Sequence, residues 1–291
     1  MIVLVLRGGL GNQMYEYASA KAMAIRANTD VVLNTRLGFE TDKEFKRQYC
    51  LDCFNIKAVN NRLLSFNFPG GSFLESLSRK CGFHILAPWY RVVNDLRVNI
   101  QDLKTHPDKY RNVLLQGTWN RTDEYFDDLK DEVFEDFRLI WKVPDVVKQY
   151  EDRIISSKKP VVALGIRLYQ DVKDKTKANE RQRPPQVEYV TDAMDWYLEK
   201  YGDVRFMVFT QVKEWFLENV ADEKYDYEFV DTGVDDKTAI FDMYLFSQCH
   251  HYILTHSTFY AWGEKLNRNK EKDVIIPKNW SLTSNDNWIR I

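Results

Sequence analysis

The sequence predicts an α/β protein built from two parallel sheets. Unbroken apolar runs such as IVLVL (residues 2–6) and VVALGI (161–166) are typical of strands buried on both faces. Segments with apolar residues at helical spacing alternate with these runs, as they do in βα units. Because the alternation restarts after the polar turn SSKKP (156–160), we expect two Rossmann-like domains, residues 1–156 and 157–291.

The first half opens with a predicted strand, glycine turn, helix and strand. The helical face is formed by Met14, Tyr17, Ala18, Ala22 and Ile25, and the second strand by VVLN (31–34). Residues from about 40 to 110 are aromatic and rich in loop-forming residues, so we interpret them as an insertion with short helices. NVLLQGTW (112–119) predicts a further buried strand.

The second half predicts a regular α/β alternation. Strands are expected at 161–166, 205–210, 227–230, 251–255 and 273–277, and helices at 187–201, 213–220, 237–249 and from about 257. Ligands of such sheets bind at the carboxyl ends of the strands. The loops that follow the strands are therefore the places to look for a site.

Composition excludes some classes of partner. The 291 residues carry 41 basic and 43 acidic side chains, a net charge of −2, without the basic excess of a nucleic-acid-binding domain. No apolar run approaches the roughly 18 residues of a membrane span. The apolar start is short and lacks a basic leader. We expect a cytoplasmic protein, with peripheral membrane contact left open.

The four cysteines do not have the spacing of a zinc site. Cys50 and Cys53 form one C-x-x-C pair, while Cys81 and Cys249 stand far apart. A structural zinc ion usually takes four ligands in two such pairs. We interpret the cysteines as buried, reduced thiols.

The opening loop is suited to an anion. Gly8, Gly9 and Gly11 lie between a predicted strand and a helix N-terminus, where backbone N–H groups and the helix dipole favour negative charge. The loop is not the dinucleotide fingerprint, because Met14 stands at the third glycine position, and no P-loop Gly-Lys-Ser/Thr follows. Asn12 is either a helix cap or a ligand-binding amide, and the turn itself has a purely structural alternative.

Two further loops have the chemistry of a phosphate site. Arg167 follows a buried strand, where a guanidinium needs a partner, either a phosphate or an inter-domain carboxylate. Ser257 and Thr258 precede a predicted helix and serve either as caps or as pyrophosphate ligands. His256 beside them is either a structural histidine or a catalyst.

Taken together, these loops carry a family resemblance. LRGGLGNQMYEYASAKAMA (6–24) resembles the N-terminal signature of the bacterial α-1,2-fucosyltransferases, glycosyltransferase family 11. GIRLYQ (165–170), SQCHHYILTHSTFYAWGEKL (247–266) and LQGTWNRTDEYF (115–126) resemble the family's arginine motif, its Ser-Thr-Phe motif and its Gly-x-Trp/Phe segment. The resemblance implies a GT-B fold whose two Rossmann-like domains face a cleft. It also implies an acceptor-side N-terminal domain and a C-terminal domain that binds the nucleotide sugar.

The resemblance assigns residues to the donor GDP-fucose. It places Gly9, Gly11 and Asn12 in the loop that faces the donor, Arg167 on its phosphates, Asp242 near its base, and Ser257, Thr258 and Phe259 in the third motif. The chain departs from the motifs at Gly165, Leu168, His256 and Ala261, where the family usually has His, Arg, Asn and Trp.

The implied activity is inverting transfer of L-fucose to the 2-hydroxyl of a galactose-terminated oligosaccharide or lipid-linked glycan, during polysaccharide biosynthesis. No metal or other cofactor is implied, since Arg167 and the two loops supply the charge stabilisation. His256 is our candidate general base. The departures leave open a degenerate member that binds without turnover, or a transferase that uses another GDP-sugar.

Overall fold

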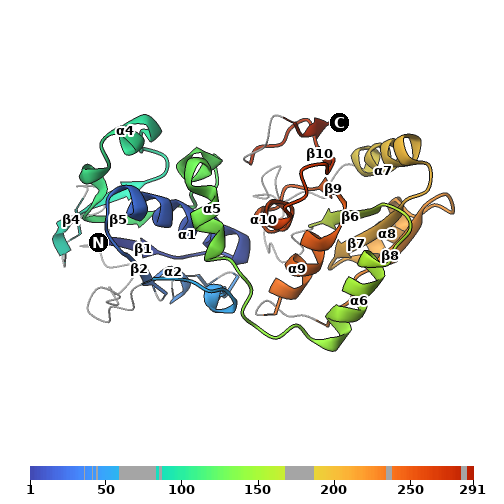
Figure 1. The fold of residues 1–291 in the computed structure, drawn as a ribbon, viewed down its shortest axis with the longest axis horizontal. Helices are drawn as coiled ribbons and strands as arrows, with labels where there is room; N and C mark the ends of the chain where they lie inside the picture. The colour runs from blue at the N-terminus through green and yellow to red at the C-terminus, as the bar shows by residue number, and fades with distance from the viewer. Residues whose placement is uncertain are drawn as a thin grey trace. The chain divides into compact units, whose positions relative to one another are not determined.

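The structure, a computed structural model, describes residues 1–35, 37–40, 42–43, 45–58, 83–84, 87–167, 187–233, 238–282 and 287–291 (Figure 1). The chain forms two compact units, Met1–Trp141 and Lys142–Ile291. The division falls before helix α6 (Asp145–Ile155), whereas we expected it after residue 156. The reason is that α6 packs on the second unit: Tyr150 donates its hydroxyl to the Phe229 carbonyl, and Arg153 pairs with Glu228.

The first unit contains a five-stranded sheet in the order β2-β1-β5-β4-β3. Its strands are β1 (Ile2–Val5), β2 (Val31–Asn34), β3 (Phe83–His84), β4 (Ala87–Asn94) and β5 (Val113–Gln116). All neighbours are parallel except β3 and β4. The carboxyl ends of β1, β5 and β4 therefore meet at one edge. The unit's α-helices in the described ranges are α1 (Leu10–Arg26), α2 (Leu37–Glu40), α4 (Ile100–Thr105) and α5 (Lys130–Glu135).

The second unit contains a six-stranded parallel sheet in the order β11-β10-β9-β6-β7-β8 (Figure 1). Its strands are β6 (Val161–Ile166), β7 (Arg205–Thr210), β8 (Asp226–Phe229), β9 (His251–Leu254), β10 (Val274–Ile276) and β11 (Ile289–Arg290). The helices joining them are α7 (Val187–Tyr201), α8 (Lys213–Asn219), α9 (Ile240–Gln248) and α10 (Thr258–Leu266).

Apolar layers on both faces of the second sheet explain why its strands are continuous apolar runs. On one face, alternate residues of β6 such as Val162 are in one apolar cluster with Tyr197 of α7 and Phe216 of α8. On the other face, the Phe246 ring of α9 lies 5.0 Å from the rings of both Phe209 and Tyr260. All six residues of β6 are buried, as the run VVALGI predicts.

The sequence-based expectations fail mainly in the first unit. Strand β4 lies inside the segment that we interpreted as a helical insertion, because Pro88 and the aromatic residues around it suggested a loop. A proline is compatible with a strand near its first residue, where its missing N–H matters least. Cys50, Cys53 and Cys249 are buried and carry thiols rather than disulfides, as predicted, whereas Cys81 lies outside the described residues.

Candidate functional site

Three neighbouring strands of the second sheet bring polar residues to one edge. β6 lies between β9 and β7, and all three run in the same direction. Arg167 follows β6, Gln211 follows β7, and residues 255–258 follow β9. This edge therefore gathers Arg167 with the predicted Ser-Thr-Phe loop, as expected of a parallel sheet.

Thr255 holds the backbone of Arg167 in place. Its hydroxyl donates to the Gly165 carbonyl at 2.7 Å, and its Oγ1 accepts the Arg167 backbone N–H at 3.2 Å. The guanidinium Nη1 of Arg167 donates to Gln211 Oε1 at 3.3 Å. Our sequence reasoning missed both Thr255 and Gln211. The sequence signal that could have identified them is a polar residue directly after each predicted strand.

The loop after β9 leads into helix α10. Ser257 occupies the N-cap position and is buried, but its side chain makes no capping hydrogen bond. Thr258 is the first helical residue, and Phe259 packs edge-on against Tyr260. The first turn of α10 contains no acidic residue, so its amide dipoles are not neutralised by the helix's own side chains.

His256 is held by two contacts from the segment after β10. Its Nε2 lies 3.1 Å from Asn279 Oδ1, and its ring stacks on Trp280 at 5.4 Å between centroids. An Nε2–H that donates to the asparagine oxygen leaves Nδ1 as the basic nitrogen. Nδ1 is buried and has no hydrogen-bond partner among the described residues.

Asp242 lies on the second unit, in the helix that follows β8. It stands in the first turn of α9, and its Oδ1 accepts the Thr232 hydroxyl at 2.6 Å, just after β8. Burial raises the pKa of this carboxyl, the bond to Thr232 lowers it, and the charge of Asp231 raises it further. Asp242 is thus bonded to the segment that follows β8, and β8 is separated from β6 by β7 in the sheet.

Two of the departures from the family motifs have a packing explanation. A Cβ at Gly165 would lie 2.5 Å from the ring of Tyr260, whose hydroxyl donates to the Phe209 carbonyl. A histidine at position 165 is therefore incompatible with this tyrosine. Ala261 is fully buried within α10. Leu168, another of the four departures, lies outside the described residues.

The glycine loop of the first unit begins α1. Gly8 has φ +72°, and a Cβ there would lie 2.6 Å from Asn12 Nδ2. Gly9 is the N-cap, Gly11 is the second helical residue, and Asn12 is the third, so Asn12 is not the cap that we considered. A Cβ at Gly9 would meet nothing within 4 Å. The described chain therefore needs a glycine at position 8, whereas at position 9 it leaves space beside the backbone.

Buried polar side chains fix the shape of this loop. Gln13 is fully buried, and its amide donates to the Gly8 and Gln48 carbonyls at 2.9 and 2.7 Å. Its Oε1 accepts the Cys50 backbone N–H at 2.9 Å. Glu16, also fully buried, accepts the Arg7 backbone N–H at 2.9 Å. The sequence analysis did not single out either role.

Burial raises the pKa of Glu16 well above its ordinary value, although the Arg7 amide and charge oppose this shift. The nearby Asp95 raises it further. Asp95 connects the ends of β4 and β5, because its Oδ2 accepts the Trp119 backbone N–H at 3.2 Å. The carboxyl edge of the first sheet thus holds a glycine loop supported by buried acids.

Within the described ranges, no group of three or more His, Cys, Asp or Glu residues is placed to hold a metal ion. No helix in the described part of the chain is long and apolar enough to cross a membrane.

Comparison with known proteins supports the sequence resemblance. The family model for glycosyl transferase family 11 matches residues 75–287. Two Escherichia coli proteins align over almost their full length: the O-antigen biosynthesis glycosyltransferase WbnK (22% identical, 98% of this chain and 99% of that protein) and an alpha-1,2-colitosyltransferase (23%, 100% and 99%). The mouse galactoside alpha-(1,2)-fucosyltransferase 1 is 35% identical over 34% of this chain and 25% of its own length.

Solved structures support the fold. The α-1,6-fucosyltransferase NodZ co-crystallised with GDP, a protein known from Bradyrhizobium, matches with a TM-score of 0.54 at 16% identity, over 91% of each chain. This likeness confirms the expected GT-B type of α/β fold with two parallel sheets. Because the family model spans well over half of the sequence, the chain belongs to glycosyltransferase family 11.

Proposed function

We propose that this chain transfers L-fucose from GDP-fucose to the 2-hydroxyl of a galactose-type acceptor, with inversion and without a metal. The observation that carries the proposal is the position of Arg167 in a family 11 chain. Thr255 and Gln211 hold this arginine at the carboxyl edge of the second sheet, on the strand next to the loop that begins α10.

The departing diphosphate gains negative charge as the glycosidic bond breaks. In our proposal, the Arg167 guanidinium and the first-turn amides of α10 stabilise this charge, with Ser257, Thr258 and Phe259 shaping the donor pocket. Such prearranged donors cost no reorganisation during the reaction, and removing one typically slows it by about 10²–10³-fold. Asp242 is proposed to bind the guanine base.

The acceptor hydroxyl loses its proton as the new bond forms. We propose His256 as the general base, with its ring held by Asn279 and Trp280. The first unit is proposed as the acceptor side, and Gly9, Gly11 and Asn12 as the loop that approaches the donor. The space beside Gly9 supports this assignment, since the described chain leaves it unfilled.

The same reaction with colitose in place of fucose is a second candidate. It is favoured by the alignment of the α-1,2-colitosyltransferase over the whole of this chain. The related O-antigen biosynthesis enzyme supports a role for either reaction in building a bacterial polysaccharide.

A donor panel tests the proposal. The purified chain is incubated in EDTA with a β-galactoside and with GDP-fucose, GDP-colitose, GDP-mannose or UDP-galactose, and nucleotide release is measured. We expect multiple-turnover GDP release from GDP-fucose and an α-1,2 linkage in the product by NMR. Turnover of GDP-colitose alone would establish the second candidate. Binding of GDP-fucose without release would mean that the chain is a degenerate member.

A further inference from the structure

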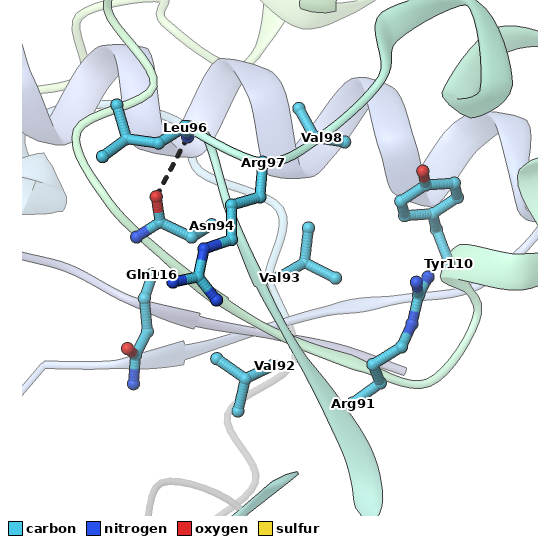
Figure 2. A pocket seen from close by; sticks show the side chains of 9 residues that line it. All are labelled: Arg91, Val92, Val93, Asn94, Leu96, Arg97, Val98, Tyr110 and Gln116. Carbon is cyan, nitrogen blue, oxygen red and sulfur yellow. Dashed lines mark hydrogen bonds between the residues drawn. The ribbon is translucent and has the colours of Figure 1, made fainter. Parts of the chain in front are cut away.

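The first unit contains a cavity of about 330 Å³ along the last residues of β4 (Figure 2). Val92 and Val93 of β4 form part of its wall, with Val98 from the following loop. Asn94 and Gln116, which are register partners, end β4 and β5 at its other side. Since β5 also pairs with β1, the cavity reaches the same edge of the sheet as the glycine loop.

The described charged residues that line the cavity are all cationic. They are the two arginines Arg91 and Arg97, and no acidic residue is among the described lining residues. This is notable in a chain whose net charge is −2. Two nearby acidic residues have partners of their own: Asp95 accepts the Trp119 backbone N–H. Asp102 pairs with Lys109 and accepts the hydroxyl of Tyr110, which lines the cavity.

The two arginines differ in their contacts. Arg91 is fixed, because its Nη2 donates to the Lys109 carbonyl at 2.9 Å and its guanidinium lies 5.0 Å from the centroid of the Tyr110 ring. Arg97 is exposed, and its guanidinium has neither a hydrogen bond nor an ion pair to any described residue. In Figure 2 its side chain extends over the cavity from the loop after β4.

Two amide side chains add hydrogen-bond donors. Asn94 Oδ1 accepts the Leu96 backbone N–H at 2.9 Å, which leaves the Asn94 NH₂ group as a donor (Figure 2). Gln116 makes no side-chain hydrogen bond within the described part of the chain and can present its own NH₂. The guanidinium and the two amides form a set of donors that matches the oxygens of an anion.

We propose that this cavity binds an anionic group, a carboxylate or a phosphate, on the acceptor glycan. Arg97 binds the anion, Asn94 and Gln116 orient it, and the valine wall packs against the apolar face of the sugar ring. The volume is at the lower end of the range for ligand pockets, about 300–1,000 Å³, and suits one or two sugar units. The inference rests on the proposed function, because it assigns the cavity to the acceptor of that reaction.

Kinetics with paired acceptors test the cavity. A neutral β-galactoside is compared with the same galactoside linked to glucuronic acid and with one bearing a phosphodiester. We expect the wild-type KM to be about tenfold lower for at least one anionic acceptor, as one charge-assisted contact provides. The acceptor whose KM is lower shows whether the bound anion is a carboxylate or a phosphate. Equal KM values for all three acceptors would overturn the proposal.

Substitutions localise the effect. Arg97→Ala should raise KM for the anionic acceptor about tenfold and leave KM for GDP-fucose and for the neutral acceptor unchanged. Arg97→Lys should raise KM for the anionic acceptor by less than Arg97→Ala does, since lysine keeps the charge but lacks the planar guanidinium that binds two oxygens at once. Lys158→Ala, which removes an exposed cation from the second unit, is the matched control. An equal change for both acceptors, or the same change in the control, would contradict the assignment.

Calorimetry with the glucuronic acid galactoside and with inorganic phosphate separates this inference from the proposed function. Binding that Arg97→Ala abolishes supports the cavity even if no donor is turned over. If GDP-fucose is turned over with the neutral acceptor but neither anion binds, the proposed function stands and the cavity assignment fails.

Discussion

The carboxylate of Glu16 accepts the backbone N–H of Arg7 at 2.9 Å from inside helix α1, so this helix holds the loop from which it starts. Gln13, one turn earlier, donates its amide to the Gly8 carbonyl. It also donates to the Gln48 carbonyl and accepts the Cys50 backbone N–H. Both side chains are fully buried, where an unpaired polar group is costly. The loop is therefore shaped from within the domain, independently of any ligand.

Glu16 gives the first prediction. Burial raises its pKa in the folded chain, so the folded state binds a proton that the unfolded state has already lost above about pH 4.5. This group's contribution to stability is present below that pH and is lost as the pH rises through the raised pKa. Glu16→Gln should leave the free energy of unfolding unchanged near pH 4.5 and increase it near pH 8, measured by urea denaturation. A lower stability of the variant at pH 8 would show that the buried carboxylate is ionised and stabilising.

Neighbouring glycines provide a matched pair. Gly8→Ser should destabilise the fold by about 1 kcal/mol or more, because of the positive φ and the contact with Asn12. Gly9→Ser should leave stability unchanged or slightly higher, since serine is a good N-cap and the space is open. If that space admits the substrate, kcat/KM of Gly9→Ser falls at least about tenfold. Full activity of a stable Gly9→Ser variant would remove the loop from the site.

Thr255 is predicted to position Arg167. Thr255→Val removes the hydroxyl that joins the Gly165 carbonyl to the Arg167 amide and should cost about 1–3 kcal/mol of stability. Transfer should slow by about tenfold or more because the arginine is less well held. Thr255→Ser keeps the hydroxyl and should restore the rate. If Thr255→Ser is as slow as Thr255→Val, the hydroxyl is not what positions Arg167.

His256 is tested by substitution. His256→Asn introduces the family's usual residue and removes the imidazole. If His256 is the base, kcat should fall by about 10²-fold while KM for GDP-fucose stays unchanged. Asn279→Ala, which removes the contact to Nε2 but keeps the imidazole, should lower kcat less than His256→Asn does. An active His256→Asn enzyme with the wild-type kcat would leave His256 a structural role only.

The local hydrophobic pattern of the sequence predicts much of this fold but only part of its candidate site. The apolar runs at Ile2–Val5 and Val161–Ile166 predict strands because both faces of each sheet are covered. Because β6 and β9 are parallel neighbours, Arg167 and Ser257, which follow them, lie at the same edge of the second sheet. Strand β4 escapes detection because Pro88 interrupts its pattern, while its pairing with β5 depends on residues more than 20 positions away.

The supporting polar contacts are non-local as well. Thr255 meets Gly165 across 90 positions, and Gln13 meets Cys50 across 37. Nothing in the neighbouring residues indicates such partners. Asn12 was considered as a cap because it is a good capping residue, but α1 begins at Leu10 and leaves Gly9 at the cap position.

The central claim is that Arg167 binds the diphosphate of GDP-fucose, and calorimetric titration tests it most directly. GDP-fucose is titrated in EDTA into the wild-type chain and into Arg167→Ala, with Lys158→Ala as the charge control and thermal unfolding as a check of the fold. The account predicts EDTA-insensitive binding that Arg167→Ala weakens by at least about tenfold while the melting temperature is kept. Equal affinity of a folded Arg167→Ala variant would contradict it.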